Sequence, residues 1–124
     1  MIATDTSSLV AYLKGQNGVD IDLLDQAAAT GQLRLPPIVI TEILSDEQSA
    51  KLLSGLLPEI LPLDLIDGFW ARAGAARRIL RQEGLKAKTA DALIAQSCID
   101  HDVALITRDT DFRHFAKHCG LKLA

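Results

Sequence analysis

Residues 86–112, KAKTADALIAQSCIDHDVALITRDTDF, decide the fold of this chain. Residues 89–99 are predicted to form a helix, because Thr89 is a suitable N-cap and apolar side chains recur every four positions after it. The run that follows, residues 103–106, is short, apolar and flanked by charges, which is typical of a strand buried on both faces in a parallel sheet. A helix that leads into a buried strand indicates an α/β domain with a largely parallel sheet.

Acidic residues stand at both ends of this unit. Asp91 lies in the first turn of the predicted helix, and Asp109 and Asp111 follow the predicted strand. Asp5 directly follows another strand-like segment, residues 2–4. Ligands of parallel sheets bind beyond the carboxyl ends of the strands, and right-handed crossovers bring the first turns of the helices to the same edge. We therefore expect these carboxylates to converge, although Asp5 is also suited to cap the helix after it.

Glu42 joins this set from the middle of the chain. Two prolines precede a helix expected from Ile38 or Val39, and Glu42 falls in its first turn. There it either complements the helix dipole, an effect of about 0.3–1 kcal/mol, or acts as a ligand, because a carboxylate among aliphatic side chains is unusual unless it is paired.

The remaining pattern predicts a single domain over residues 1–124. Phe112 and Phe115 are expected in the core by their spacing. Helices are predicted after residues 2–4, around 21–31, over 65–83 and before Gly120, with short extended segments at 33–35, 59–61 and 121–123.

Six cations lie within 17 residues of this net acidic chain. Most decorate the polar side of the helix predicted over residues 65–83, and the others follow it just before Asp91. They form either an ordinary solvated face or a rim that contacts phosphates beside the acidic edge. The six are Arg72, Arg77, Arg78, Arg81, Lys86 and Lys88.

The composition is that expected of a soluble globular protein. The chain has 124 residues, 48% of them hydrophobic, and a net charge of -3, which favours a stable core and argues against binding nucleic acid by bulk positive charge. Cys98 and Cys119 show no ligand spacing and no secretion signal precedes them, so free thiols in the reducing cytoplasm are expected. No apolar run approaches the roughly 20 residues of a membrane helix.

A converging set of carboxylates needs compensation. Two carboxylates about 4 Å apart repel by roughly 4 kcal/mol at an effective dielectric near 20, while a whole domain is stable by only about 5–15 kcal/mol. Either protons are taken up, which raises some pKa values, or a divalent cation with a preference for oxygen ligands binds there. Magnesium or manganese is the natural candidate.

At this point the chain resembles the PIN domains, and in particular the VapC-like toxins of bacterial toxin-antitoxin pairs. The resemblance covers essentially the whole chain and rests on MIATDTSSLVAYL, VITEIL around Glu42, KTADALIAQSCIDHDVALITRDTDF and the closing FRHFAKHCGLKL. It implies a three-layer α/β/α fold with a central, mainly parallel sheet. The fourth acidic position of the family matches Asp109, which leaves Asp111 either to support the site from behind or to cap the last helix.

The resemblance also implies a metal-dependent ribonuclease. Asp5, Asp91 and Asp109 would hold Mg²⁺ or Mn²⁺, and Glu42 would be a further ligand or would position the attacking water. The products would carry a 5′-phosphate and a 3′-hydroxyl, and the cations would grip the RNA backbone without reading its sequence. Three hydroxyls are expected to fix the carboxylates by hydrogen bonds: Thr6, Ser7 and Thr107.

The family further implies partners: a cognate VapB-like antitoxin that blocks the acidic site, and a second copy of the chain in a homodimer. We expect the antitoxin's apolar contacts on the leucine-dense segment at residues 51–65, which includes Leu53, Leu56 and Leu57, and on the helix over residues 65–83.

Two other function classes remain open on the sequence. One is a binding module that keeps the fold without chemistry, and the other is a receiver-type phosphoacceptor domain, which also gathers aspartates around Mg²⁺. A haloacid dehalogenase type is disfavoured, because it needs an Asp two residues after Asp5 and position 7 is Ser. Metal-dependent cleavage of RNA separates the nuclease from both.

Overall fold

The computed structural model describes residues 1–55 and 60–124. Within them the chain forms five strands and seven helices. The strands are β1 (Ile2–Thr4), β2 (Leu33–Leu35), β3 (Leu61–Pro62), β4 (Ala104–Ile106) and β5 (Lys122–Leu123). The helices are α1 (Thr6–Leu13), α2 (Val19–Ala29), α3 (Pro37–Leu44), α4 (Glu47–Ser54), α5 (Phe69–Gln82), α6 (Thr89–His101) and α7 (Phe112–Cys119).

The strands form one sheet in the order β3-β2-β1-β4-β5, and every pairing is parallel. β1 lies at the centre, with Ile2 opposite both Leu33 of β2 and Ala104 of β4. This arrangement confirms the predicted α/β fold with a central parallel sheet, which helices cover. All carboxyl ends of the strands therefore meet at one edge.

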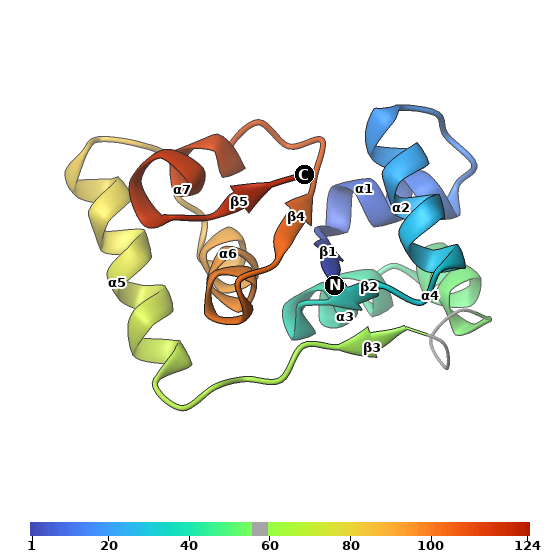
Figure 1. The fold of residues 1–124 in the computed structure, drawn as a ribbon, viewed down its shortest axis with the longest axis horizontal. Coiled ribbons are helices and arrows are strands. Elements are labelled where there is room, and N and C mark those ends of the chain that lie inside the picture. Colours follow the sequence, from blue (N-terminus) through green and yellow to red (C-terminus); the bar gives the residue numbers. More distant parts are fainter. Residues whose placement is uncertain (56–59) are drawn as a thin grey trace.

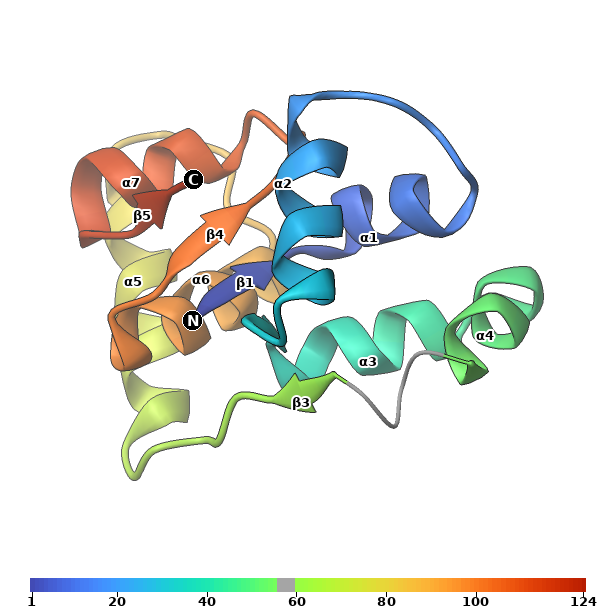
Figure 2. The ribbon, with the colours of Figure 1, turned by 45° about the vertical axis from the view of Figure 1, so that its right-hand side comes forward.

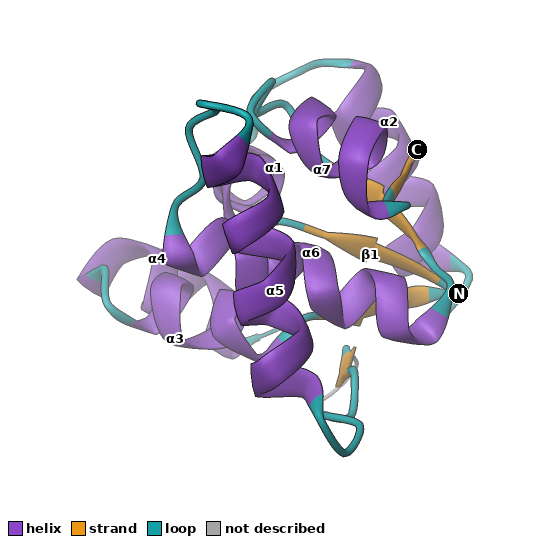
Figure 3. Cartoon of the chain, turned by 90° about the vertical axis from the view of Figure 1, so that its left-hand side faces the viewer, coloured by secondary structure: helices purple, strands orange, loops and turns teal. Residues whose placement is uncertain are grey.

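The helices gather in two groups around the sheet. In Figure 1, α5, α6 and α7 lie on one side of the molecule, and α1, α2 and α4 lie on the other. Figure 2 shows β1 and β4 side by side, with α6 behind them. α5 packs along the outside of α6, as Figure 3 shows from the side. α6 is therefore an inner helix, which explains why most of its residues between Ala92 and Cys98 are buried.

The core is built from aliphatic side chains of both groups together with two aromatic rings. Phe112 and Phe115 of α7 are fully buried, with their ring centroids 6.2 Å apart, which confirms the prediction from their spacing. Burial of one such side chain contributes roughly 1.5–3 kcal/mol. Leu53, in the leucine-dense segment, is also fully buried. It therefore belongs to the core and is not available for the antitoxin contact expected of it.

Two predicted elements differ from the structure. The helix predicted over residues 65–83 begins at Phe69, because Gly68 precedes it with φ of 86°, a left-handed conformation that interrupts a helix. Leu65, which the predicted helix includes, lies outside α5 and is 43% exposed. The strand predicted at 59–61 is β3, Leu61–Pro62. Glu59, like Leu56 and Leu57, lies outside the described residues.

Smaller differences concern the ends of elements. Thr89 is the first residue of α6 and not its cap, which is Lys88 without a capping side-chain hydrogen bond. α7 ends as predicted at Gly120, whose φ of 80° is the left-handed conformation favoured there. Across the parts of the chain that the structure describes, no helix has the length and apolar character needed to cross a membrane.

Candidate metal centre

The pairing of β1 with β4 brings the two ends of the sequence together. Thr4 pairs with Ile106, the last residue of β4. The backbone N–H of Asp5 donates to the carbonyl oxygen of Ile106 at 3.1 Å. Asp5 and Thr107, the residues that follow the two strands, therefore lie side by side although 102 positions separate them in the sequence.

The carboxylate of Asp5 is buried and accepts hydrogen bonds from neighbouring groups of the protein. Its Oδ2 accepts hydrogen bonds from Thr107 Oγ1 at 2.6 Å and Ser7 Oγ at 2.7 Å, and its Oδ1 accepts one from the Ser8 backbone N–H at 2.9 Å. Burial raises the pKa of Asp5 above its usual value, an effect that the Thr107 hydrogen bond opposes most and the Asp109 charge reinforces. The contact to Ser8 makes Asp5 the N-cap of α1, so the capping function and a place at the acidic edge coexist.

Asp91, Asp109 and Asp111 form a cluster in which one oxygen of each carboxylate lies within 4.8 Å of the others. Asp91 reaches it from the first turn of α6, and the other two from the loop after β4. That loop is fixed locally: the N–H of Asp109 donates to Thr107 Oγ1 at 3.0 Å, and the N–H of Asp111 donates to Asp109 Oδ1 at 2.9 Å. Asp111 makes no capping side-chain hydrogen bond to α7, so its carboxylate is directed to the cluster.

The electrostatics of Asp91 show the mutual repulsion of these acids. Its pKa is raised to about 6, first by partial burial and then by the charge of Asp109. Lys88 opposes the shift, while Asp111 and Glu42 add to it. Burial and the neighbouring acids thus make the ionised form of Asp91 costly, although that form still predominates at neutral pH, so the cluster gains from a bound cation.

Glu42 faces the cluster from α3. Its Oε1 accepts a hydrogen bond from Thr6 Oγ1 at 2.6 Å, and its charge acts on Asp91. Because α3 begins at Pro37, Glu42 lies in the second turn and the first turn holds no acidic residue. The interpretation that Glu42 only complements the helix dipole is therefore wrong, and its place beside the other acids has to be explained by the site.

The donor set fits a hard divalent cation. The cluster offers three carboxylate oxygens, the ligand type that Mg²⁺ and Mn²⁺ prefer. At Mg–O distances of about 2.1 Å, neighbouring ligand oxygens lie about 3 Å apart and opposite ones about 4.2 Å, so the three carboxylates, whose oxygens lie within 4.8 Å of one another, have to approach one another to ligate one ion. The family resemblance implied Asp5, Asp91 and Asp109 as the metal ligands. In the structure Asp111 is the third member of the cluster, whereas Asp5 lies next to it and accepts hydrogen bonds from two hydroxyls.

The predicted cationic rim divides into three parts. Lys86 lies over the cluster, with Nζ 3.7 Å from Asp111 Oδ2, and Lys88 precedes Asp91 by three residues and acts on its charge. Arg77 Nε donates to the carbonyl oxygen of Ala87 at 2.8 Å and so holds the loop that carries both lysines.

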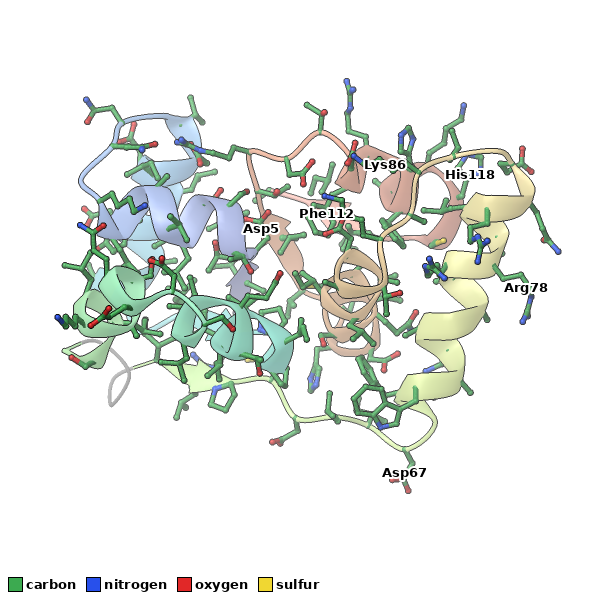
Figure 4. All side chains as sticks on the ribbon, turned by 180° about the vertical axis from the view of Figure 1, so that it is seen from behind. Asp5, Asp67, Arg78, Lys86, Phe112 and His118 are labelled. Atoms are coloured by element: carbon green, nitrogen blue, oxygen red, sulfur yellow. The ribbon has the colours of Figure 1, made fainter. Side chains whose placement is uncertain are left out.

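The other arginines lie farther away. Arg78 and Arg81 line an open hollow on the outer side of α5, and Figure 4 shows Arg78 projecting outward at the edge of the molecule, away from Asp5. Arg72 forms an ion pair with Asp100 near the end of α6, at 2.7 Å. The structure therefore does not bring Arg72 to the acidic edge.

The sequence analysis did not predict the contact between Arg108 and Asp20. Arg108 lies between Thr107 and Asp109, and its guanidinium binds Asp20 at 2.8 Å. Asp20 in turn accepts a hydrogen bond from Ser8 Oγ at 2.8 Å. The sequence carries no periodic or spacing signal that links position 20 to position 108, because the contact arises only when α2 packs beside β4.

An apolar cleft of about 160 Å³ lies between α3, α5 and α6. Leu65, Phe69 and Trp70 are among the residues that line it, and 67% of Trp70 is exposed. Thr41, the neighbour of Glu42, also lines the cleft. The remaining lining residues are Pro37, Ile38, Leu93 and Ser97.

Comparisons with known proteins give a consistent result. A family model described as PIN domain matches residues 2–118. Among solved structures, the fold is similar to that of VapBC2 from Rickettsia felis, bound to a DNA fragment from their promoter, with a TM-score of 0.79 and 22% identity over 100% of this chain and 98% of that one.

Two further crystal structures are similar in the same way. FitAcB from Neisseria gonorrhoeae gives a TM-score of 0.68 and 20% identity over 99% of this chain and 96% of that one. DNA-bound VapBC from Salmonella typhimurium gives 0.73 and 16% over 100% and 98%. The arrangement of helices around the parallel sheet is thus shared over the full length of these chains.

Proposed function

This chain belongs to the PIN domain family, and from this premise we propose that it is a metal-dependent endoribonuclease, the VapC-like toxin of a toxin-antitoxin pair. The observation that carries the proposal is the meeting of Asp91, Asp109 and Asp111 within 4.8 Å beside Asp5 and Glu42. PIN domains are in general nucleases, and the three solved relatives include toxin-antitoxin complexes. Its site of action is the cytoplasm.

The acidic residues have different roles in this proposal. Asp91, Asp109 and Asp111 would hold the cation, and Asp5 would join them through the lone pairs that its three donors leave free. When bound, Mg²⁺ or Mn²⁺ supplies Lewis acidity: it lowers the pKa of water and neutralises the charge that builds on the phosphate. Thr107 and Ser7 keep the Asp5 carboxylate in one orientation.

Glu42 acts on the attacking water. Its carboxylate, held by Thr6, accepts a proton from water, and a positioned general base of this kind contributes typically 10²–10⁴-fold to a rate. The water oxygen attacks phosphorus in line, the bond to the 3′ oxygen breaks, and that oxygen takes up a proton. The products carry a 5′-phosphate and a 3′-hydroxyl, and no covalent enzyme intermediate is formed.

The substrate backbone is gripped by the cations near the cluster. Lys86 and Lys88 flank the acids, Arg77 supports their loop, and Arg78 and Arg81 extend the positive surface along α5. These contacts give affinity without sequence readout. Arg72 is not part of this proposal, because its guanidinium is engaged by Asp100.

A VapB-like antitoxin is the proposed partner, and the cleft between α3, α5 and α6 is where its apolar side chains bind. Trp70 is an exposed aromatic anchor of the kind that dominates such interfaces. Trp70→Ala is expected to weaken antitoxin binding at least tenfold, whereas Ile79→Ala, on the same helix and 40% exposed, is the matched control. Equal binding by the two variants contradicts this placement. The toxin unit is proposed to be a homodimer, which sedimentation of the purified chain tests.

The nuclease proposal is tested with protein freed of partner, mixed RNA and either Mn²⁺ or EDTA. Cleavage is expected only with the metal, and Asp91→Asn is expected to abolish it with the circular dichroism spectrum retained. Asp67→Asn is the control, because Asp67 is exposed and lies far from Lys86 in Figure 4. Cleavage in EDTA, or unchanged cleavage by Asp91→Asn, overturns the proposal. A binding module cleaves nothing, and a receiver takes up phosphate from a small acyl phosphate.

A further inference from the structure

Arg108 and Asp20 form a bidentate ion pair beside the acidic site. Arg108 Nε lies 2.8 Å from Asp20 Oδ2, and Nη2 lies 3.1 Å from Oδ1. Only 14% of the Asp20 side chain and 34% of the Arg108 side chain are exposed. Hydrogen bonds from Arg108 lower the pKa of Asp20 to about 2. A paired guanidinium and carboxylate in this geometry form one of the stronger polar contacts in proteins.

This ion pair is connected to Asp5 by two routes. On the Asp20 side, Ser8 Oγ donates to Asp20 Oδ2 at 2.8 Å, and the Ser8 N–H donates to Asp5 Oδ1 at 2.9 Å. On the Arg108 side, the adjacent Thr107 donates to Asp5 Oδ2 at 2.6 Å. The result is a closed ring of hydrogen bonds and backbone that contains one acid of the site and adjoins Asp109.

The connection between α1 and α2 is shaped around the same pair. Arg108 also donates to Gln16 Oε1 at 3.0 Å and to the carbonyl oxygen of Asn17 at 3.3 Å. A Cβ at Gly18 would lie 2.5 Å from Asp20 Oδ1 and 3.2 Å from Arg108 Nη2. Glycine is therefore required at position 18 for two reasons: a side chain would clash with the ion pair, and the φ of 153° is disfavoured for any residue with a side chain.

We propose that Arg108 and Asp20 are positioning residues, whose ion pair ties the connection between α1 and α2 to the loop after β4 and so fixes Asp5 and Asp109 for cation binding. This proposal depends on the proposed function only for the identity of the ligand, which is a divalent cation. The competing account is that the pair merely stabilises the fold.

The chain offers a matched control for that account. Arg72 and Asp100 form a second bidentate pair, with Arg72 Nε and Nη2 at 2.9 and 2.7 Å from the two carboxylate oxygens. The Asp100 side chain is 8% exposed and the Arg72 side chain 41%. This pair resembles the first in geometry and burial, but it lies at the other end of α6 from Asp91. Loss of either pair should destabilise the fold to a similar degree.

The experiment measures Mn²⁺ binding by titration calorimetry, together with urea unfolding in EDTA, without RNA. Arg108→Gln and Asp20→Asn are each expected to weaken Mn²⁺ binding at least tenfold, the usual effect of removing a support behind metal ligands. Combining the two substitutions should weaken binding no further, because both remove the same contact. Arg108→Lys, which retains the charge, should lie between Arg108→Gln and the unsubstituted protein. Arg72→Gln should lose comparable stability and keep its Mn²⁺ affinity within twofold.

The outcomes distinguish failure of the positioning role of the ion pair from failure of the nuclease function. If the Arg108 and Arg72 variants bind Mn²⁺ equally well, the ion pair is structural only and the positioning role is overturned. If the unsubstituted protein binds Mn²⁺ but cleaves no RNA, the nuclease function fails while the positioning role still stands on the affinities. If it binds no Mn²⁺ at all, both fail. Should Arg108→Gln not fold, Asp20→Asn and Arg108→Lys carry the same comparison.

Discussion

Replacing Asp91 with Asn is expected to stabilise the metal-free protein at neutral pH while removing its function. The pKa of Asp91 is raised to about 6 by burial and by Asp109. A raised carboxyl pKa means that the folded state favours the neutral form. The contribution to stability is therefore complete below the unfolded pKa, near 3.8, and is lost as the pH rises through about 6. Asn resembles the neutral acid at every pH.

The magnitude follows from the size of the shift. Between 3.8 and about 6 the pKa moves by about two units, which corresponds to roughly 3 kcal/mol at 1.36 kcal/mol per unit. Asp91 is only partly buried, and screening by solvent reduces such values. We therefore expect Asp91→Asn to stabilise the metal-free protein by about 1–2 kcal/mol at pH 7.5 and by less than about 0.5 kcal/mol at pH 4.

The assay is urea unfolding at the two pH values, first in EDTA and then with Mn²⁺. Ligand at a hundredfold excess over its Kd stabilises a protein by about 2.7 kcal/mol, so Mn²⁺ should raise the stability of the unsubstituted protein above that of Asp91→Asn and reverse their order. Asp67→Asn should stay within about 0.5 kcal/mol throughout. The reasoning is refuted if Asp91→Asn destabilises the protein in EDTA at pH 7.5, or if its effect is the same at both pH values.

Three further predictions concern residues around the site. Thr107→Val removes both hydrogen bonds that Thr107 makes to the acids and should lower the free energy of unfolding by about 2–4 kcal/mol, measured in urea; a loss below about 0.5 kcal/mol contradicts the account. Lys86→Gln and Lys88→Gln should each reduce the slope of log affinity for single-stranded RNA against log salt by about 0.7, and an unchanged slope excludes a phosphate contact. Burial raises the pKa of Cys98 to about 12, so iodoacetamide at pH 8 should modify the less buried Cys119 first and Cys98 only after unfolding, as mass spectrometry of the peptides would show.

The sequence predicts at which edge of the sheet the acids lie, but not how each side chain is oriented, because the prediction follows from the topology of the strands. Once residues 2–4 and 103–106 are parallel strands, Asp5 and Asp109 must follow them at one edge of the sheet, and the structure places them there. Whether Asp111 caps α7 or faces the acids depends on how the loop after β4 turns. Hydrogen bonds to Thr107 Oγ1 and Asp109 Oδ1 fix that turn, and residue type alone does not reveal it.

The misplaced start of α5 has a different origin. The apolar spacing of residues 65–83 is helical throughout and does not indicate that the helix begins only after Gly68. In the structure the guanidinium of Arg72 folds back over this position, since a Cβ at Gly68 would lie 2.5 Å from Arg72 Nη1. The same guanidinium donates to the carbonyl oxygen of Asp67 at 2.8 Å. A helix end fixed by a side chain one turn later, whose own anchor is Asp100, depends on tertiary contacts and leaves no local signal.

The long sequence separations within the site make cation binding a property of the whole fold. Thr107 and Asp5 are 102 residues apart, and Thr6 and Glu42 are 36 apart, so no local segment can assemble the ligands alone. Because β1 lies between β2 and β4, opening β4 displaces Thr107, which supports Asp5, and opening β2 displaces α3, which follows it and carries Glu42. A bound cation should therefore slow hydrogen exchange across the central strands as well as at the loop after β4. Protection confined to that loop would mean that the three clustered aspartates bind the ion without the rest of the acidic edge.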